Sequence, residues 1–208
     1  MKNTKKAFTL VELLIVIAII GILVGMLTPM ISSAQKRAVA STSKTFLINI
    51  ASALERYQAE YGYFPDFLAS RDRVNLADEN FSEGMIKALT GKTADGARLS
   101  QSDRKEYNRK ARNFIDIASS NIVKKNGKNM LVDSFENPNI YVCVDADNDG
   151  FIKAGLPNIS DGFSIQEVRE IVPNQSSGIR SKAVLFTLKK DSFRATADYT
   201  SENVFTWY

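Results

Sequence analysis

Histidine is absent from the 208-residue sequence, and cysteine occurs once, as Cys143. Without histidine there is no imidazole general acid or base, no Ser-His-Asp or Cys-His nucleophile arrangement, and no zinc site of the usual histidine-containing kind. A single cysteine excludes an intrachain disulfide. Because the commonest catalytic constellations are missing, the sequence favours a structural protein and not an enzyme.

A large excess of one charge is also missing. The sequence has 27 Lys and Arg against 23 Asp and Glu, a formal net charge of +4. Three of these cations, Lys2, Lys5 and Lys6, lie in the first seven residues, and removing them from +4 leaves +1. Basic side chains recur from 104 to 112, but acids lie among them, which predicts an exposed face of mixed charge: Asp103, Arg104, Lys105, Glu106, Arg109, Lys110 and Arg112. We therefore expect no nucleic-acid partner.

The sequence does contain one long apolar run, from Ala7 to Ile31, in which Glu12 is the charged residue. The run exceeds the about 7–15 apolar residues of a secretory signal and reaches the about 20 that span a bilayer. The lysines before it hold the start of the chain in the cytoplasm. Residues 8–31 are therefore predicted to cross the membrane once, with the C-terminal part outside the cytoplasm.

Glu12 is the unusual feature of this run. A charged side chain at bilayer depth costs about 2.5–3.5 kcal/mol on insertion scales, and such residues generally have a partner and a function. Gly21 and Gly25 form a G-x-x-x-G spacing, which allows close approach of a second helix. On hydropathy alone, an uncleaved signal anchor is the simpler alternative. The carboxylate favours a helix that associates with other helices.

The stretch KKAFTLVELLIVIAIIGIL resembles the leader and hydrophobic start of type IV pilins and type II secretion pseudopilins. The resemblance implies that a prepilin peptidase cuts between Ala7 and Phe8 and methylates the new amine of Phe8. Glu12 then corresponds to the glutamate that meets the terminal amine of a neighbouring subunit. Residues 1–7 become a leader peptide. Ala7 stands where the family more often has glycine.

A pilin-like chain implies a defined set of partners. The expected function is that of a structural subunit of a homo-oligomeric filament, either a type II secretion pseudopilus or a type IV pilus-like fibre. Before assembly the chain would lie in the lipid of the bacterial inner membrane, where an assembly platform and minor pseudopilins act on it. After assembly it would form a periplasmic or cell-surface filament.

The predicted fold is α+β, with a long N-terminal helix and a small C-terminal antiparallel β-sheet. Three- and four-residue spacing of apolar residues continues the helix through 32–62, until Gly62 and Pro65 end it. A globular domain is expected over 63–208, with a loop region at 63–129 and a sheet region at 130–208. Within the loop region, residues 82–89 are predicted to form a short helix capped by Ser82.

Strand patterns follow near the C-terminus. Residues 139–144, 182–188 and 203–208 are rich in β-branched and aromatic side chains, which predicts three strands across the outer half of the long helix. Cys143 lies in the first of them and is expected to be buried. The stretch VDSFENPNIYV resembles a segment of pseudopilin carboxyl domains, although Glu136 stands where glycine is usual.

The stretch DADNDG places Asp145, Asp147 and Asp149 at alternate positions, followed by a glycine that permits a sharp turn. Calcium prefers six to eight oxygen ligands, and such a ladder supplies several from one loop. The loop is not an EF-hand, because Leu156 occupies the closing glutamate position. Further oxygens would come from the Phe151 carbonyl or from Asp161. The pseudopilin resemblance implies a structural calcium here, and the alternative is an acidic turn without an ion.

Two other functions are compatible with these patterns. The chain could be a membrane-anchored, calcium-dependent binding module that does not polymerise, in which case Glu12 would matter little. An anchored hydrolase with the three aspartates as a metal site is disfavoured, because no nucleophile or base stands beside them.

Overall fold

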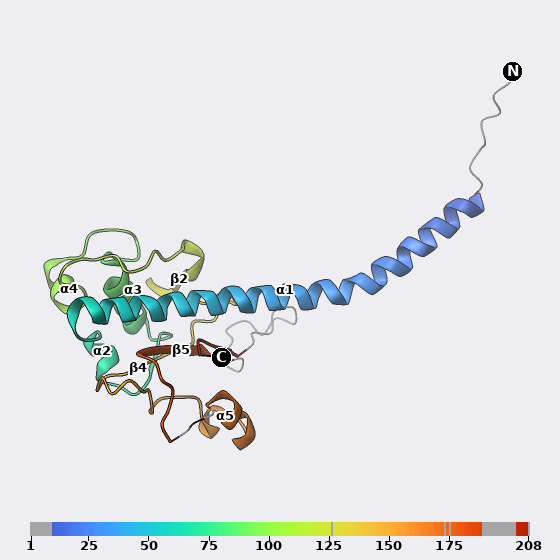
Figure 1. Ribbon diagram of the computed structural model, residues 1–208. Helices are drawn as coiled ribbons and strands as arrows, with labels where there is room; N and C mark the ends of the chain where they lie inside the picture. The colour runs from blue at the N-terminus through green and yellow to red at the C-terminus, as the bar shows by residue number, and fades with distance from the viewer. Residues whose placement is uncertain (1–9, 126, 173, 175, 189–202, 208) are drawn as a thin grey trace. The chain divides into compact units, whose positions relative to one another are not determined.

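The computed structural model describes residues 10–125, 127–172, 174, 176–188 and 203–207, without the side chains of 27–32. The chain divides into two compact units, Met1–Ala38 and Val39–Tyr208. Helix α1, Leu10–Tyr61, runs through the boundary between them (Figure 1). The expected cleavage pair, Ala7 and Phe8, lies outside the described residues.

In the first unit, every side chain described from Leu10 to Met26 is exposed. Among the described ranges, no helix combines the length and the mean hydropathy of a membrane span.

The end of α1 agrees with the sequence prediction. Gly62 adopts a left-handed conformation, with φ at +81°, and its N–H donates to the carbonyl of Gln58 at 2.7 Å. Glycine takes this conformation without the steric cost that a Cβ adds, so it is the common residue just after a helix.

In the second unit, α1 buries one face against the sheet. Leu47, Ile50 and Leu54 repeat at three- and four-residue spacing and are inaccessible to solvent. They share one core with residues of the sheet, including Ile140 and Leu185. The predicted α+β arrangement, with a helix packed on a small antiparallel sheet, is confirmed.

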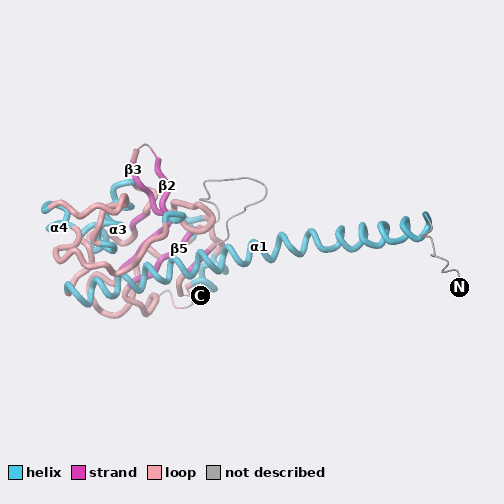
Figure 2. The backbone as a smooth tube through the Cα atoms, turned by 90° about the horizontal axis from the view of Figure 1, so that it is seen from above, coloured by secondary structure: helices cyan, strands magenta, loops and turns pink. Residues whose placement is uncertain are grey.

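The main sheet has four antiparallel strands in the order β1-β4-β5-β6. They are β1 Val74–Asn75, β4 Ile140–Val144, β5 Ala183–Thr187 and β6 Val204–Phe205. Three of these lie within the three segments predicted as strands. The fourth, β1, comes from the segment expected as loop and pairs with β4 through Val74↔Val142. A separate hairpin joins β2, Ile122–Lys125, to β3, Lys128–Leu131 (Figure 2).

The segment 63–129 is therefore far more structured than the expected loop region. Besides β1, β2 and the start of β3 it holds α2 Asp66–Ala69, α3 Glu79–Thr90, α4 Gln101–Glu106 and the 3-10 helix η1 Ser119–Asn121. The predicted helix over 82–89 exists as α3, but its cap is Asp78, whose side chain accepts from Asn80 N at 2.9 Å. The prediction that Ser82 caps this helix is wrong. This serine is fully buried inside α3, and its Oγ accepts the N–H of Leu131 at 2.6 Å.

The sheet is covered on its other face as well. Successive residues of β5 alternate between two cores, so that Leu185 faces α1 whereas Val184 and Phe186 join a second cluster. That cluster also contains Ile171, from α5 Ile165–Ile171, which follows the 3-10 helix η2 Ile159–Asp161. Cys143 lies there, 1% exposed, and burial raises the pKa of its thiol to about 12. The predicted burial of Cys143 is confirmed.

Candidate functional site

Glu12 lies in the first described turn of α1, where its neighbours are exposed aliphatic side chains. Gly21 and Gly25 have open space on their outer side, since a Cβ added to either would meet no atom within 4 Å. Contiguous exposed apolar surface of this extent marks a protein-interaction or membrane site. The described part of the first unit therefore carries a face suited to packing against other helices.

The three aspartates predicted to bind a metal are brought together directly after β4. One carboxylate oxygen from each of Asp145, Asp147 and Asp149 lies within 4.8 Å of the others. Asp145 is 3% exposed, and the N–H groups of Asp149 and Gly150 donate to its two oxygens at 3.2 and 2.9 Å. The loop is thus folded around its own carboxylates, with Gly150 at a φ of +89°.

A lysine that the sequence analysis did not consider takes part in this loop. Lys153 forms an ion pair with Asp149, four residues earlier. The hydrogen bond from Lys153 lowers the pKa of the Asp149 carboxyl, and the same contact raises the pKa of Lys153. The signal for this pair in the sequence is the spacing of four residues between the acid Asp149 and the base Lys153. A metal ion at the loop would compete with the ammonium group for Asp149.

Asp161, the further carboxylate suggested as a ligand from the sequence, has other partners. Asp161, 8% exposed, accepts a hydrogen bond from Arg73 at 2.9 Å and caps η2 through the N–H of Asn158. Its carboxylate is therefore engaged away from the aspartate ladder. Leu156 is buried in the second core, which agrees with the exclusion of an EF-hand. The Phe151 N–H donates to Asp149 Oδ1 at 2.8 Å.

A cleft of about 330 Å³ borders the loop, between it and the turn that follows α2. Asp72, Asp145 and Asp147 lie in its lining, together with the basic residues Arg71 and Lys153. Asn148, in the same loop, accepts a hydrogen bond from Gln58 of α1 at 2.5 Å. An anionic loop of hard oxygen ligands, anchored to a helix, fits a calcium ion by the chemistry of its donors.

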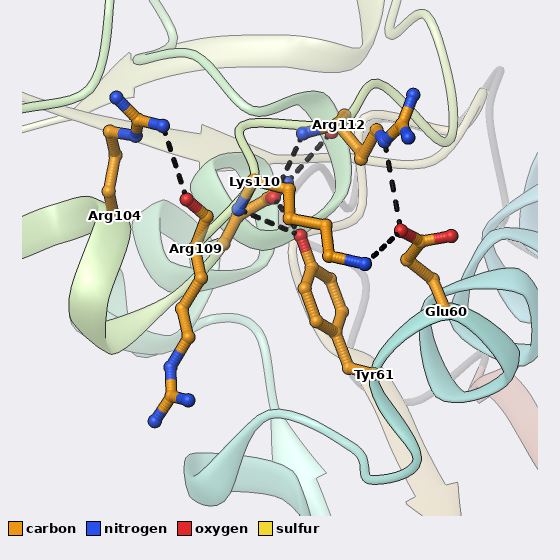
Figure 3. A network of polar contacts seen from close by, with 7 residues as sticks. Glu60, Tyr61, Arg104, Arg109, Lys110 and Arg112 are labelled. Carbon is orange, nitrogen blue, oxygen red and sulfur yellow. Dashed lines mark hydrogen bonds and ion pairs between the residues drawn. The ribbon is translucent and has the colours of Figure 1, made fainter.

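Lys110 and Arg112, from the basic segment 104–112, contact the last turn of α1 (Figure 3). Glu60 accepts a hydrogen bond from Lys110 at 2.6 Å and lies 3.7 Å from Arg112. The Tyr61 hydroxyl donates to Asn108 at 2.6 Å and accepts the N–H of Lys110 at 3.1 Å. The Lys110 hydrogen bond lowers the pKa of the Glu60 carboxyl. Two of the five basic side chains are thus committed to the carboxylate at the end of α1.

Comparison with known proteins identifies the class of the N-terminal segment. The family described as the prokaryotic N-terminal methylation motif matches residues 2–28. These residues include the Lys-Lys pair, Ala7, Phe8 and Glu12, on which the resemblance rested. The predicted prepilin-type N-terminus is therefore confirmed.

A named relative agrees with this class. Over 60 residues the chain is 45% identical to the type IV wide pilus major component PilA4 of Thermus thermophilus. The similar region covers 29% of this chain and 45% of that protein, so the chain spans less than half the length of the relative. No solved structure matches the chain.

Proposed function

We propose that this chain is a structural subunit of a pilus-like filament, with no catalytic role. The observation that carries the proposal is the methylation motif at residues 2–28, joined to a helix whose described apolar side chains are exposed from Leu10 to Met26. The similarity to a type IV wide pilus major component supports the same assignment. A type II secretion pseudopilus is the alternative form of the filament.

Assembly would proceed from the bacterial inner membrane. Prepilin peptidase removes residues 1–7 and methylates Phe8, and an assembly platform with minor subunits transfers the apolar helices from lipid into a shared fibre core. There Glu12 of one subunit pairs with the Phe8 amine of its neighbour. A carboxylate and an ammonium group that meet in a poorly hydrated place compensate each other, whereas either one alone is costly there. The pair would fix the register between subunits.

Mass spectrometry of filaments sheared from cells tests the proposal. We expect this chain to be recovered in the fibre with N-methylated Phe8 as its first residue. Changing Ala7→Arg should leave the chain starting at Met1 and absent from the fibre, because a long charged side chain replaces the small residue before the cut. A wild-type chain that still begins at Met1 in cells with active prepilin peptidase contradicts the proposal.

We also propose that the loop Asp145–Gly150 holds a structural calcium ion. The proximity of the three carboxylates and the donor chemistry support it. The ion would draw Asp149 away from Lys153 and tie the loop to the end of β4. It implies no catalysis, since a metal that folds a loop contributes stability alone.

Calcium should raise the melting temperature of the full chain. An ion that binds only the folded state stabilises it by about 2.7 kcal/mol at 100 times its Kd. For a chain of this size that is an increase of about 5–10 °C. The change Asp147→Asn should remove most of the increase, and Asp116→Asn, at an exposed carboxyl in another loop, should leave it intact. Equal melting temperatures with calcium and with a chelator would refute the site.

A further inference from the structure

The ammonium group of Lys153 is a positive charge placed directly on the aspartate loop, Asp145–Gly150. Of the ion pairs between described residues, its contact with Asp149 is the one that involves this loop. The hydrogen bond to Asp149 raises the pKa of Lys153 most, and the charges of Asp149, Asp147 and Asp145 raise it further. A single ammonium group therefore offsets part of the charge of three carboxylates.

The folded loop gathers negative charge that needs compensation. One oxygen from each of the three carboxylates lies within 4.8 Å of the others, and like charges at such distances repel. Backbone N–H groups offset part of this repulsion: two donate to Asp145, and that of Phe151 donates to Asp149 at 2.8 Å. The N–H groups supply only partial positive charges, whereas the ammonium group supplies a full one. In the ion-free chain Lys153 therefore acts as a counter-ion of the loop.

The position of Lys153 conflicts with a bound metal ion. The Phe151 N–H donates to Oδ1 of Asp149, and the ammonium group of Lys153 donates to Oδ2. Both oxygens of this carboxylate are thus engaged. Calcium binds carboxylate oxygens at about 2.3–2.6 Å, and an ammonium group on the same carboxylate would repel it. The lysine side chain must therefore leave Asp149 when the ion arrives.

The side chain of Lys153 can leave without disturbing the fold. It is 52% exposed and that of Asp149 is 36% exposed, so water and ions reach the pair. Lys153 also lines the cleft of about 330 Å³ beside the loop, which gives the side chain room. The main chain is held one residue earlier, where Ile152 exchanges two backbone hydrogen bonds with Ile179 at 2.8 and 2.9 Å. The side chain can therefore move while the main chain keeps its place.

We propose that Lys153 is a built-in counter-ion that calcium displaces from the aspartate loop, so that this lysine sets the calcium concentration at which the loop binds the ion. The inference rests on the calcium site proposed above. Without calcium, the ammonium group stabilises the folded loop. With calcium, the metal ion replaces it on Asp149 and the ammonium group returns to water. Binding is thus an exchange of one cation for another, and its affinity reflects the difference between the two contacts.

Calorimetric titration of the full chain in detergent with calcium chloride tests the exchange. Lys153→Gln keeps a polar side chain and removes its charge, so the Kd for calcium should fall about threefold, within the range that an exposed ion pair contributes to an equilibrium. Lys105→Gln, at an exposed lysine of α4, should keep the wild-type Kd. A Kd for Lys153→Gln equal to or above that of the wild type overturns the exchange and leaves the calcium site standing. If neither chain binds calcium, the site itself is refuted and the exchange with it.

Thermal unfolding gives a second readout, one that a purely structural lysine would not change. With a chelator, Lys153→Gln should melt below the wild type, because the three carboxylates lose their counter-ion. In saturating calcium the two chains should melt together, because the ammonium group no longer contacts Asp149 in the loaded wild type. A difference of the same size with chelator and with calcium would show that Lys153 stabilises the loop whether or not the ion is bound, and it would overturn the exchange.

Discussion

Replacing Glu12 with leucine should abolish filaments while leaving the processed chain in the cell at its normal level. If Glu12 compensates the Phe8 amine of the next subunit, removing the carboxylate leaves an unpaired ammonium group in each contact. Breaking one side of a buried ion pair costs about 3–5 kcal/mol, which is a hundredfold or more in a contact equilibrium. Because a filament repeats the contact at every subunit, the loss compounds along the fibre. The measurement is the amount of chain recovered in sheared filaments.

Two control variants separate charge from shape. Glu12→Gln keeps the size of the side chain and removes its charge, so it should also lower filament yield sharply. Glu55→Gln removes a carboxylate on the exposed side of α1 in the second unit and should leave filaments at the wild-type amount. Wild-type filament yield from Glu12→Leu would contradict the pairing and favour a membrane-anchored binding module that does not polymerise.

Features that depend on neighbours in sequence were predictable. The end of α1 at Tyr61 follows from apolar spacing and from Gly62, and strands β4 and β5 follow from short runs of β-branched and aromatic residues. The aspartate ladder, with its alternate spacing inside one loop, was found on the same basis. These signals are local, and the structure preserves them.

Features that depend on distant partners were not predictable. Strand β1 has two residues, too few for a periodic pattern, and exists because it pairs with β4. Ser82 follows the rule for a helix cap, yet it serves as a buried acceptor for the backbone of β3. Asp161 is a reasonable metal ligand by its position in the sequence, but in the structure it accepts a hydrogen bond from Arg73, 88 residues away. Sequence spacing carries no information on such contacts.

Glu136 departs from the residue type usual at this position, and the departure bears on the backbone conformation. The sequence has glutamate where pseudopilins usually have glycine, and the backbone there is left-handed, with φ at +56°. Glycine adopts this conformation freely, whereas a residue with a Cβ is strained by about 1–2 kcal/mol. The turn keeps its shape because Asp133 accepts the N–H groups on either side of Glu136, from Phe135 and Asn137.

Changing Gly91→Ala should destabilise the second unit by about 2–5 kcal/mol. Gly91 ends α3 with φ at +66°, where a Cβ costs about 1–2 kcal/mol. The added atom would lie 2.6 Å from the carbonyl oxygen of Ala111, and forcing it into a packed site costs about 1–3 kcal/mol more. The segment around Ala111 cannot move aside easily, because the buried Asn108 side chain forms hydrogen bonds with both the N–H and the carbonyl of Arg112.

The matched control is Gly96→Ala. Gly96 also has a left-handed backbone, but no other atom lies close to the position of an added Cβ. Gly96 has φ at +80°, and a Cβ there would meet no atom within 4 Å. It should therefore lower the free energy of unfolding by only the backbone term of about 1–2 kcal/mol. Denaturant unfolding of the full chain in detergent measures both. If the two variants shift the midpoint equally, the segment around Ala111 yields freely. The segment 104–112 would then not hold the last turn of α1 rigidly through Glu60.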